Sequence, residues 1–187
     1  MKGIIFNLLE GFLCEGWGEQ AYDEIVAMCP LHTREPFVGP GTYPDADLFA
    51  IVAAATNKLG VTADQALHAF GEYAFPHLVR KFPVFVESHH HPKTFLKTID
   101  DVIHVEVRKF FRDATPPRIT FVDPGPDELL LIYESRRRLC ALVTGLIEGC
   151  ALYFRTPIGH RQTQCMKAGS PTCHFYLTFA ETSTAAA

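Results

Sequence analysis

The sequence lacks long hydrophobic runs and an excess of positive charge, and each absence excludes a class of protein. Its apolar stretches are interrupted by Asn, Glu, Lys or Gly well short of the roughly 18 residues that a transmembrane helix needs. With 17 Lys and Arg against 21 Asp and Glu, the formal net charge is −4, so nucleic acid is not an expected partner. The segment 1–14 also lacks the small-residue cleavage site of a signal peptide. These absences predict a cytoplasmic protein that does not enter a membrane.

The residues that are present indicate a packed core. Hydrophobic residues make up 48% of the chain and 15 of its residues are Phe, which is a globular composition. A length of 187 residues suffices to bury such a core in one domain. In a reducing compartment the six cysteines need not form disulfides and are packed thiols or metal ligands.

The N-terminal part of the chain has the apolar spacing of helices. Thr62, followed by Asp64 and Gln65, is a typical helix start, and the Thr-Pro-Pro at 115–117 ends the last helix of this part. Helices are expected over residues 2–13, 18–28, 45–58, 62–75 and about 93–111. The pattern therefore predicts a helical lobe over about residues 1–90, followed by one further helix.

After about residue 115 the spacing of the apolar residues changes from that of helices to that of strands. Strands are expected over residues 118–122, 128–134, about 157–166 and 172–180, with a helix over about 137–154. The predicted fold class is α+β, an N-terminal helical lobe plus a C-terminal four-stranded antiparallel sheet with an inserted helix. One domain is expected over residues 1–180, its second lobe beginning near residue 91, with a frayed tail at 181–187.

Tyr133, Ser135 and Arg137 are spaced by two at the end of an expected strand. In an extended segment such residues point to one face. Two hydroxyls and a guanidinium suit a phosphate or a pair of carboxylates. A purely structural interpretation makes Ser135 a helix N-cap and Arg137 a surface residue. The spacing alone leaves both interpretations open.

His104 lies in an apolar stretch of an expected helix, residues 102–107. A lone His in this setting is commonly a packed core residue. An imidazole on an apolar helix face is also what a haem iron requires as its axial ligand. The two haem propionates would then need donors such as Tyr133, Ser135 and Arg137. The two sets of residues together favour haem more than either set alone.

Three motifs together resemble the H-NOX family, the haem nitric oxide/oxygen-binding domains related to the haem domain of soluble guanylate cyclase. They are MKGIIFNLLEGF at residues 1–12, HVEVRKFFRDATPPRI at 104–119 and YESRR at 133–137. The expected order of helices and strands also matches the family over essentially the whole chain. The resemblance implies that haem b lies between the two lobes, with His104 as the proximal iron ligand.

The resemblance also assigns the residues around the haem. It implies that Tyr133, Ser135 and Arg137 hold the propionates. It implies further that Ile5 and Pro117 pack against the porphyrin, with Pro117 helping to distort it.

On the distal side the resemblance predicts an apolar wall. Family members that hold O₂ stably have a Tyr five residues after the motif Arg, where this chain has Leu142. Their second polar residue comes from the helix near residue 74, here Ala74, and the N-terminal helix contributes Leu9. Bound O₂ gains from a hydrogen-bond donor in a dry pocket, and NO needs that donor far less. The expected ligands of the ferrous haem are therefore NO and CO, with O₂ excluded, and an oxygen sensor of the same fold is the alternative.

The resemblance implies a sensor, and no catalytic residue is identified. NO bound opposite His104 is expected to weaken the iron–His104 bond and relax the haem. The helix carrying His104 and the N-terminal lobe would then shift, as a two-state element biased by its ligand. Since no output domain is visible in 187 residues, the expected partner is another chain. The family suggests a histidine kinase or a cyclic-di-GMP enzyme.

Cys140, Cys165 and Cys173 are candidates for a second metal site. Cys165 and Cys173 lie symmetrically about a KAGSP turn, so a hairpin would place them opposite each other. Three Cys and one His form a tetrahedral zinc set, and some bacterial H-NOX proteins have a similar structural zinc. Structural zinc, buried thiols and an oxidised Cys165–Cys173 pair all remain open. A zinc-held protein without haem is accordingly another functional alternative.

The histidine of this set departs from the expected spacing. Gln162 stands three residues before Cys165, where the resemblance would place a His. His160 and His174 are the remaining candidates for the fourth zinc ligand. The run His89–His91 is expected to be a solvated turn, because adjacent loop residues do not easily converge on one ion.

Overall fold

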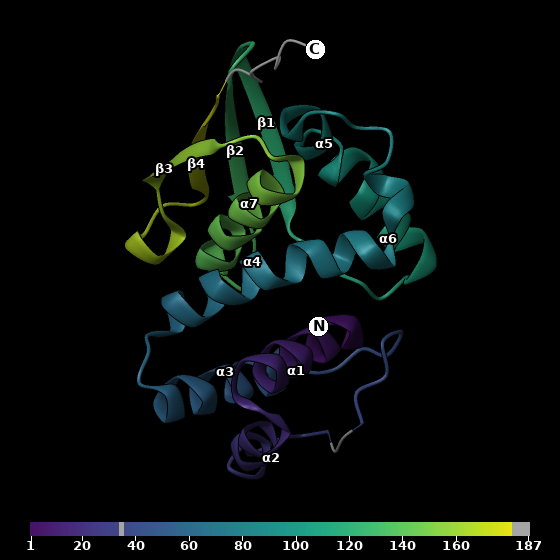
Figure 1. Ribbon diagram of the computed structural model, residues 1–187, viewed down its shortest axis with the longest axis vertical. Helices are drawn as coiled ribbons and strands as arrows, with labels where there is room; N and C mark the ends of the chain where they lie inside the picture. Colours follow the sequence, from purple (N-terminus) through teal and green to yellow (C-terminus); the bar gives the residue numbers. More distant parts are fainter. Residues whose placement is uncertain (34–35, 181–187) are drawn as a thin grey trace.

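The computed structural model describes residues 1–33 and 36–180. Its elements are α1 (Gly3–Trp17), α2 (Glu19–Ala27), α3 (Asp45–Leu59), α4 (Ala63–Lys81), α5 (Pro92–Leu96), a π-helix (Ile99–His104), α6 (Val105–Phe110), β1 (Arg118–Gly125), β2 (Glu128–Glu134), α7 (Cys140–Phe154), β3 (Ile158–Gln164) and β4 (Cys173–Phe179). Short 3₁₀ turns occur at Pro83–Phe85 and Met166–Ala168. The fold is α+β, as predicted (Figure 1). The predicted frayed tail lies outside the described residues.

The first four helices form the predicted helical lobe, and α4 separates α1–α3 from the sheet (Figure 1). Thr62 caps α4 as predicted: its hydroxyl accepts the N–H of Gln65 at 3.2 Å, and the Gln65 side chain accepts the N–H of Thr62 at 2.9 Å. Buried apolar side chains of α1, α3 and α4 meet in one hydrophobic cluster. Among the helices of the described residues, none is both long and apolar enough to span a bilayer.

The four strands form an antiparallel sheet in the order β1-β2-β4-β3. Leu129, Leu131 and Tyr133 alternate along β2 toward the buried face, where α7 packs (Figure 1). Tyr133 pairs with Ile119 of β1 on one side and with Cys173 of β4 on the other. The register therefore places the strand end that carries Tyr133 beside the cysteine hairpin.

α4 and α7 approach each other through glycines. A Cβ placed on Gly145 of α7 would lie 1.9 Å from the carbonyl oxygen of His68 in α4. One placed on Gly71 of α4 would lie 2.5 Å from the carbonyl oxygen of Leu142. Only residues without a side chain permit backbones to come this close. This contact joins the helical lobe to the sheet lobe.

The prediction of one helix over residues 93–111 is wrong, because the segment is divided into α5, the π-helix and α6. The hydroxyl of Thr98 bonds back to the carbonyl of Phe95, which competes with regular winding. The carbonyl of Thr98 then accepts the N–H groups of both Val102 and Ile103. The second of these bonds spans five residues, as in a π-helix.

The predicted start of α7 at residue 137 is also corrected, since the helix begins at Cys140. Arg138 has a φ of 51°, in the left-handed region, and delays regular winding. Leu139 is the residue at the N-cap position. The structural interpretation, in which Ser135 is the N-cap of this helix, is therefore wrong.

Candidate functional site

His104 stands at the end of the π-helix with its side chain 14% exposed. Its Nδ1 lies 3.0 Å from Oδ1 of Asp100, which also accepts the N–H of Ile119 at 3.3 Å. A carboxylate on Nδ1 favours the tautomer that has its proton there. Histidines that ligate metals commonly donate this N–H to a carboxylate, which leaves Nε2 for the metal. Asp100 was missed in the sequence, although it lies one helical turn before His104.

Burial keeps the ring of His104 neutral. It lowers the pKa of His104 by more than hydrogen bonding to Asp100 and to the backbone of Pro117 raises that pKa. At pH 7 the imidazole is therefore uncharged, which is the form that binds a metal ion.

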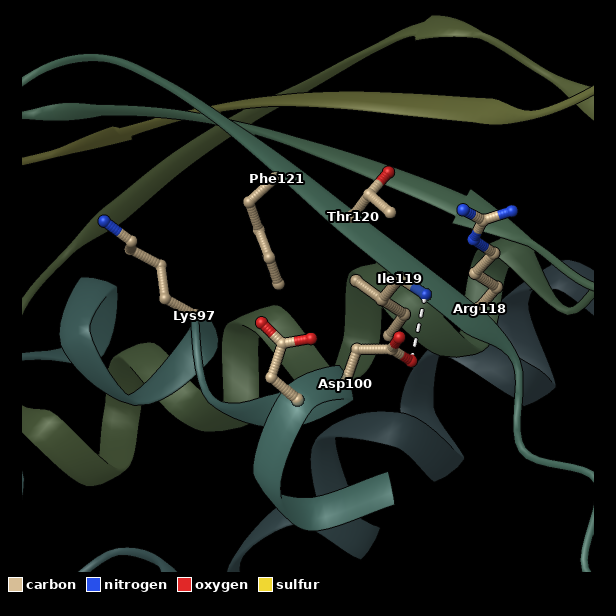
Figure 2. Close-up of a pocket in the computed structure, with 7 residues that line it drawn as sticks. Lys97, Asp100, Arg118, Ile119, Thr120 and Phe121 are labelled. Atoms are coloured by element: carbon tan, nitrogen blue, oxygen red, sulfur yellow. Dashed lines mark hydrogen bonds between the residues drawn. The ribbon is translucent and has the colours of Figure 1, made fainter. Parts of the chain in front are cut away.

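A cleft opens on the other side of Asp100, between the π-helix and β1 (Figure 2). Its lining is mainly polar and consists of Lys97, Asp100, Asp101, Arg118, Ile119, Thr120 and Phe121. Figure 2 shows the hydrogen bond from the Ile119 backbone to Asp100 at this position. Solvent therefore has access to the carboxylate that orients His104.

Tyr133 and Ser135 lie buried at the end of β2. The Tyr133 hydroxyl accepts the N–H of Leu139 at 3.2 Å and lies near the Ser135 hydroxyl. Burial raises the pKa of Tyr133, so the phenol keeps its proton at neutral pH. Ser135 Oγ accepts the N–H of Arg137 at 3.2 Å. Both hydroxyls thus accept backbone N–H groups of the segment that follows β2.

Arg137 connects this segment to the helical lobe. Its Nε lies 2.7 Å from Oδ2 of Asp45, the first residue of α3. Its two terminal nitrogens donate to the carbonyl and the hydroxyl of Thr115, at 2.7 and 2.9 Å. The guanidinium therefore already binds a carboxylate, the functional group that a haem propionate presents. The donor set fits that prosthetic group.

The predicted distal residues gather in the hydrophobic cluster of the helical lobe. Leu9 of α1 and Ala74 of α4 are 4% exposed within it, and Ile5 and Leu142 pack against it. Pro117 is half-buried just before β1. Three elements far apart in the sequence thus contribute to one apolar surface.

The three candidate cysteines come together, including the pair Cys165 and Cys173 to which the hairpin argument applied. The sulfur atoms of Cys140, Cys165 and Cys173 all lie within 4.8 Å of one another, and those of Cys140 and Cys165 are 3.9 Å apart. Tetrahedral zinc with Zn–S bonds of about 2.3 Å separates its sulfurs by about 3.8 Å. All six cysteines of the chain are described, and none forms a disulfide.

Backbone amides point at this cysteine group. The N–H of Met166 donates to Cys173 Sγ at 3.2 Å. Burial raises the pKa of Cys165, but the nearby Lys167 and Ala168 amides together with the Cys140 and Cys173 thiols lower that pKa by more, so the net pKa is below the usual value. Burial raises the pKa of Cys173 to about 11. Cys165 is thus the thiol most readily ionised, and the amides support negative charge on sulfur.

Neither candidate histidine joins the cysteines. His174 follows Cys173 in β4 and so faces the other side of the sheet, where its Nε2 contacts Thr172 at 3.0 Å. His160 pairs with Leu177, four residues or about 13 Å along β4 from Cys173. The structure therefore does not support the spacing-based placement of His160 or His174 as the fourth ligand.

The His89–His91 run behaves as a turn, as predicted. The ring of His91 accepts the N–H of Lys93 at 3.2 Å and so caps α5. Within residues 1–33 and 36–180, no group of three or more metal-ligating side chains includes a member of this run.

The α+β fold, shared with solved haem proteins in NO-bound and CO-bound states, defines a class, the haem-based gas-sensing domains. The model of the haem-NO-binding family matches residues 2–162, so the chain belongs to the haem-NO-binding, or H-NOX, family.

Solved H-NOX structures share this fold. An H-NOX protein from S. oneidensis in its Fe(II)NO state is 29% identical, with a TM-score of 0.91 over 97% of this chain and 100% of that chain. The H-NOX domain from Shewanella oneidensis in its Fe(II)CO state is 28% identical, with a TM-score of 0.87 over 97% and 99% of the two chains. Unliganded Fe(II) H-NOX from K. algicida is 23% identical, with a TM-score of 0.89 over 98% of each chain, a likeness of fold alone.

Proposed function

We propose that this protein is a haem-based sensor that binds nitric oxide and carbon monoxide at ferrous haem and does not hold O₂. The observation that carries the proposal is the apolar cluster formed by Leu9, Ala74 and Leu142. The NO-bound and CO-bound states of the S. oneidensis proteins support the two ligands. The proposal concerns ligand binding and includes no catalytic step.

When bound, the haem supplies an iron atom at which a diatomic gas can coordinate. His104 would offer Nε2 to that iron while its Nδ1–H stays on Asp100. Tyr133, Ser135 and Arg137 would donate hydrogen bonds to the propionates.

Side chains above and below the ring would complete the site. Ile5 and Pro117 would pack against the faces of the porphyrin, since both are half-buried and apolar. Leu9, Ala74 and Leu142 would exclude water on the gas-binding side, and none of them can donate a hydrogen bond to a ligand. Bound O₂ would lack the donor that stabilises its negative charge, and NO would not need it.

We infer that the signal leaves through contacts between the lobes. Arg137 joins the end of β2 to Asp45 at the start of α3, so movement near His104 and the propionate donors would reach the helical lobe. A partner chain would read this change, and a histidine kinase or a cyclic-di-GMP enzyme is the proposed partner. The cytoplasmic location expected from the sequence stays a prediction.

Optical spectroscopy tests the proposal directly. The purified ferrous protein should show a strong Soret band that shifts on addition of NO and, separately, of CO. In air the ferrous protein should give no stable oxy spectrum. A stable oxy spectrum would make the protein an oxygen sensor of the same fold. A colourless protein that cannot take up added haem would overturn the whole proposal in favour of a non-haem function.

We also propose that Cys140, Cys165 and Cys173 bind a structural zinc ion. The 3.9 Å sulfur separation and the amide N–H groups aimed at the sulfurs support three thiolate ligands. The fourth ligand would come from outside the two histidines considered above. Elemental analysis should find zinc that a mercurial reagent releases, and Cys165→Ser should hold one zinc ion fewer per chain. Zinc-free protein with reactive thiols after purification in zinc-supplemented medium would contradict this assignment.

A further inference from the structure

A second group of metal-ligating side chains lies where α4, α7 and β3 meet. It consists of His68 and Glu72 on α4, Glu148 on α7 and His160 on β3. The ligand atoms of His68, Glu72 and Glu148 all lie within 4.8 Å of one another. His160 Nε2 lies 3.0 Å from the same Glu148 Oε1 that is 3.2 Å from His68 Nε2. One imidazole and two carboxylates of α4 and α7 therefore converge, and His160 of β3 reaches this group through Glu148.

The backbone holds this group in place. His68 and Glu72 are four residues apart in α4, so their side chains share one helix face. The adjacent glycine of α7, Gly149, has room for no side chain, because its Cβ would lie 2.9 Å from the carbonyl oxygen of Glu72. Such close packing keeps Glu148 beside the two α4 residues. The ligand atoms are thus largely arranged before any ion binds.

The distances fit a small transition-metal ion. Zinc bonds of about 2.0–2.2 Å to His nitrogen and carboxylate oxygen place neighbouring ligand atoms about 3.3–3.5 Å apart in a tetrahedron. The two His–Glu148 separations of 3.0 and 3.2 Å are close to that range, and His160 would move toward His68 and Glu72 to complete the set. Side-chain exposures of 34% for His68 and 39% for Glu148 leave a path for an ion from solvent.

The charge state of the group also suits a cation. Burial raises the pKa of Glu148, but the hydrogen bonds of His160 and His68 lower that pKa by more, so the net pKa is below the usual value. The carboxylate is therefore ionised at neutral pH. A metal ion would take the place of the proton shared between His160 Nε2 and Glu148.

We propose that this group is a binding site for a divalent transition-metal ion of the zinc class, separate from the cysteine group: His68, Glu72, Glu148 and His160. A bound ion would tie α4 and α7 to β3. Because α4 carries Ala74 and α7 carries Leu142, the ion would stabilise the helix pair that frames the apolar cluster. The site depends on side-chain geometry and not on the proposed haem function.

Calorimetric titration of the tag-free full chain with Zn²⁺ tests the proposal. A Cys140→Ser/Cys165→Ser background removes the thiolate group, and one ion per chain should still bind. His68→Gln and His160→Gln in that background should each weaken binding at least tenfold. His77→Gln is the matched control, since His77 lies on the same helix with its Nε2 3.8 Å from a single carboxylate, Glu15. Equal affinity in all three variants, or no binding at all, would overturn the proposal.

Equilibrium dialysis with elemental analysis provides a second measurement if the serine variants fail to fold. With all cysteines intact, the His68→Gln/His160→Gln double variant should hold one Zn²⁺ fewer per chain than His77→Gln. The same number of ions in both proteins would contradict the site. Circular dichroism of each variant confirms that the comparison is between folded chains.

Discussion

Gly145 of α7 and His68 of α4 lie in direct backbone contact, with the space for a Cβ on Gly145 only 1.9 Å from the carbonyl oxygen of His68. No rotamer change can relieve such a clash, because the atom in the way belongs to the main chain. The absence of a methyl group at Gly145, together with that at Gly71 and Gly149, therefore sets the distance between the two helices. It also sets the separation of Ala74 and Leu142, which these helices carry.

Gly145→Ala should consequently lower the free energy of unfolding by about 1–3 kcal/mol or more, since the helices must separate. Gly16→Ala is the matched control, because Gly16 is a helical glycine with no heavy atom within 4 Å of its Cβ position. That control should be neutral or stabilising by up to about 1 kcal/mol. Urea unfolding followed by circular dichroism measures the free energy of unfolding of both variants. Equal values would show that α4 and α7 can separate at little cost in free energy.

His104→Ala should lose haem and regain it when imidazole is supplied, because the cavity then admits a free ligand. Asp100→Asn should retain the fold but bind haem about 10- to 100-fold more weakly, since the ring loses its charged acceptor. Haem content by the pyridine haemochrome assay, with and without imidazole, distinguishes the two effects. Undiminished haem in His104→Ala without imidazole would rule out His104 as the iron ligand.

Arg137→Ala should weaken haem retention and also lower the free energy of unfolding by about 1.5–3 kcal/mol, because Asp45 and Thr115 lose a charged donor. Arg136→Ala is the matched control, since its side chain is exposed in the same segment. Haem transfer to apomyoglobin and urea unfolding measure the two effects. Equal haem transfer rates in both variants would remove Arg137 from the propionate site.

Leu142→Tyr should give a ferrous protein with a stable oxy spectrum in air, because a phenol enters the apolar cluster as a hydrogen-bond donor. Leu142→Phe has nearly the same shape without the hydroxyl and should behave like the wild type. Spectra recorded in air before and after reduction settle the comparison. Oxygen binding by the Phe variant would show that cavity size, and not the donor, determines selectivity.

Asp47 is fully buried and should make the helical lobe sensitive to acid. It accepts N–H groups of His32 and Thr33 at 2.9 and 3.1 Å. Burial raises the pKa of Asp47, but the hydrogen bonds from His32 and Thr33 lower it by more, so the folded pKa lies below the unfolded value of about 3.9. The stabilisation is present above pH 3.9 and lost as the pH falls through the folded pKa.

Asp47→Asn should therefore cost about 1–3 kcal/mol of unfolding free energy at pH 7, and the difference from wild type should shrink below about pH 4. Asp23→Asn, at an exposed position of α2, serves as the control. Urea titrations at a series of pH values test both statements. A pH-independent difference would show that the carboxylate charge has no part in the stabilisation.

Local signals in the sequence predict much of this fold. The bounds of β2, the Thr62 cap and the order of helices and strands follow from side-chain periodicity and capping chemistry, which involve near neighbours. The meeting of Cys165 and Cys173 also follows, since they flank one turn, whereas the approach of Cys140 depends on how α7 packs on the sheet. The sequence resemblance identified the family correctly.

The remaining features depend on partners that are distant in the chain. Arg137 binds Asp45, which lies 92 residues earlier, and no local pattern indicates that pair. His160 faces Glu148 because of strand register and glycine-mediated helix packing, which its departure from the expected spacing before Cys165 could not reveal. The π-helix depends on the backbone N–H of Ile103, which donates to the carbonyl of Thr98, five residues earlier.

That winding has a geometric consequence for the imidazole of His104. A π turn closes its hydrogen bond one residue later than an α turn, and one residue of an α-helix corresponds to about 100° of rotation. If Ile99–His104 were rewound as an α-helix, every later residue would turn by roughly that angle relative to α5. The choice of a single hydrogen-bond acceptor therefore determines the direction in which the imidazole of His104 points.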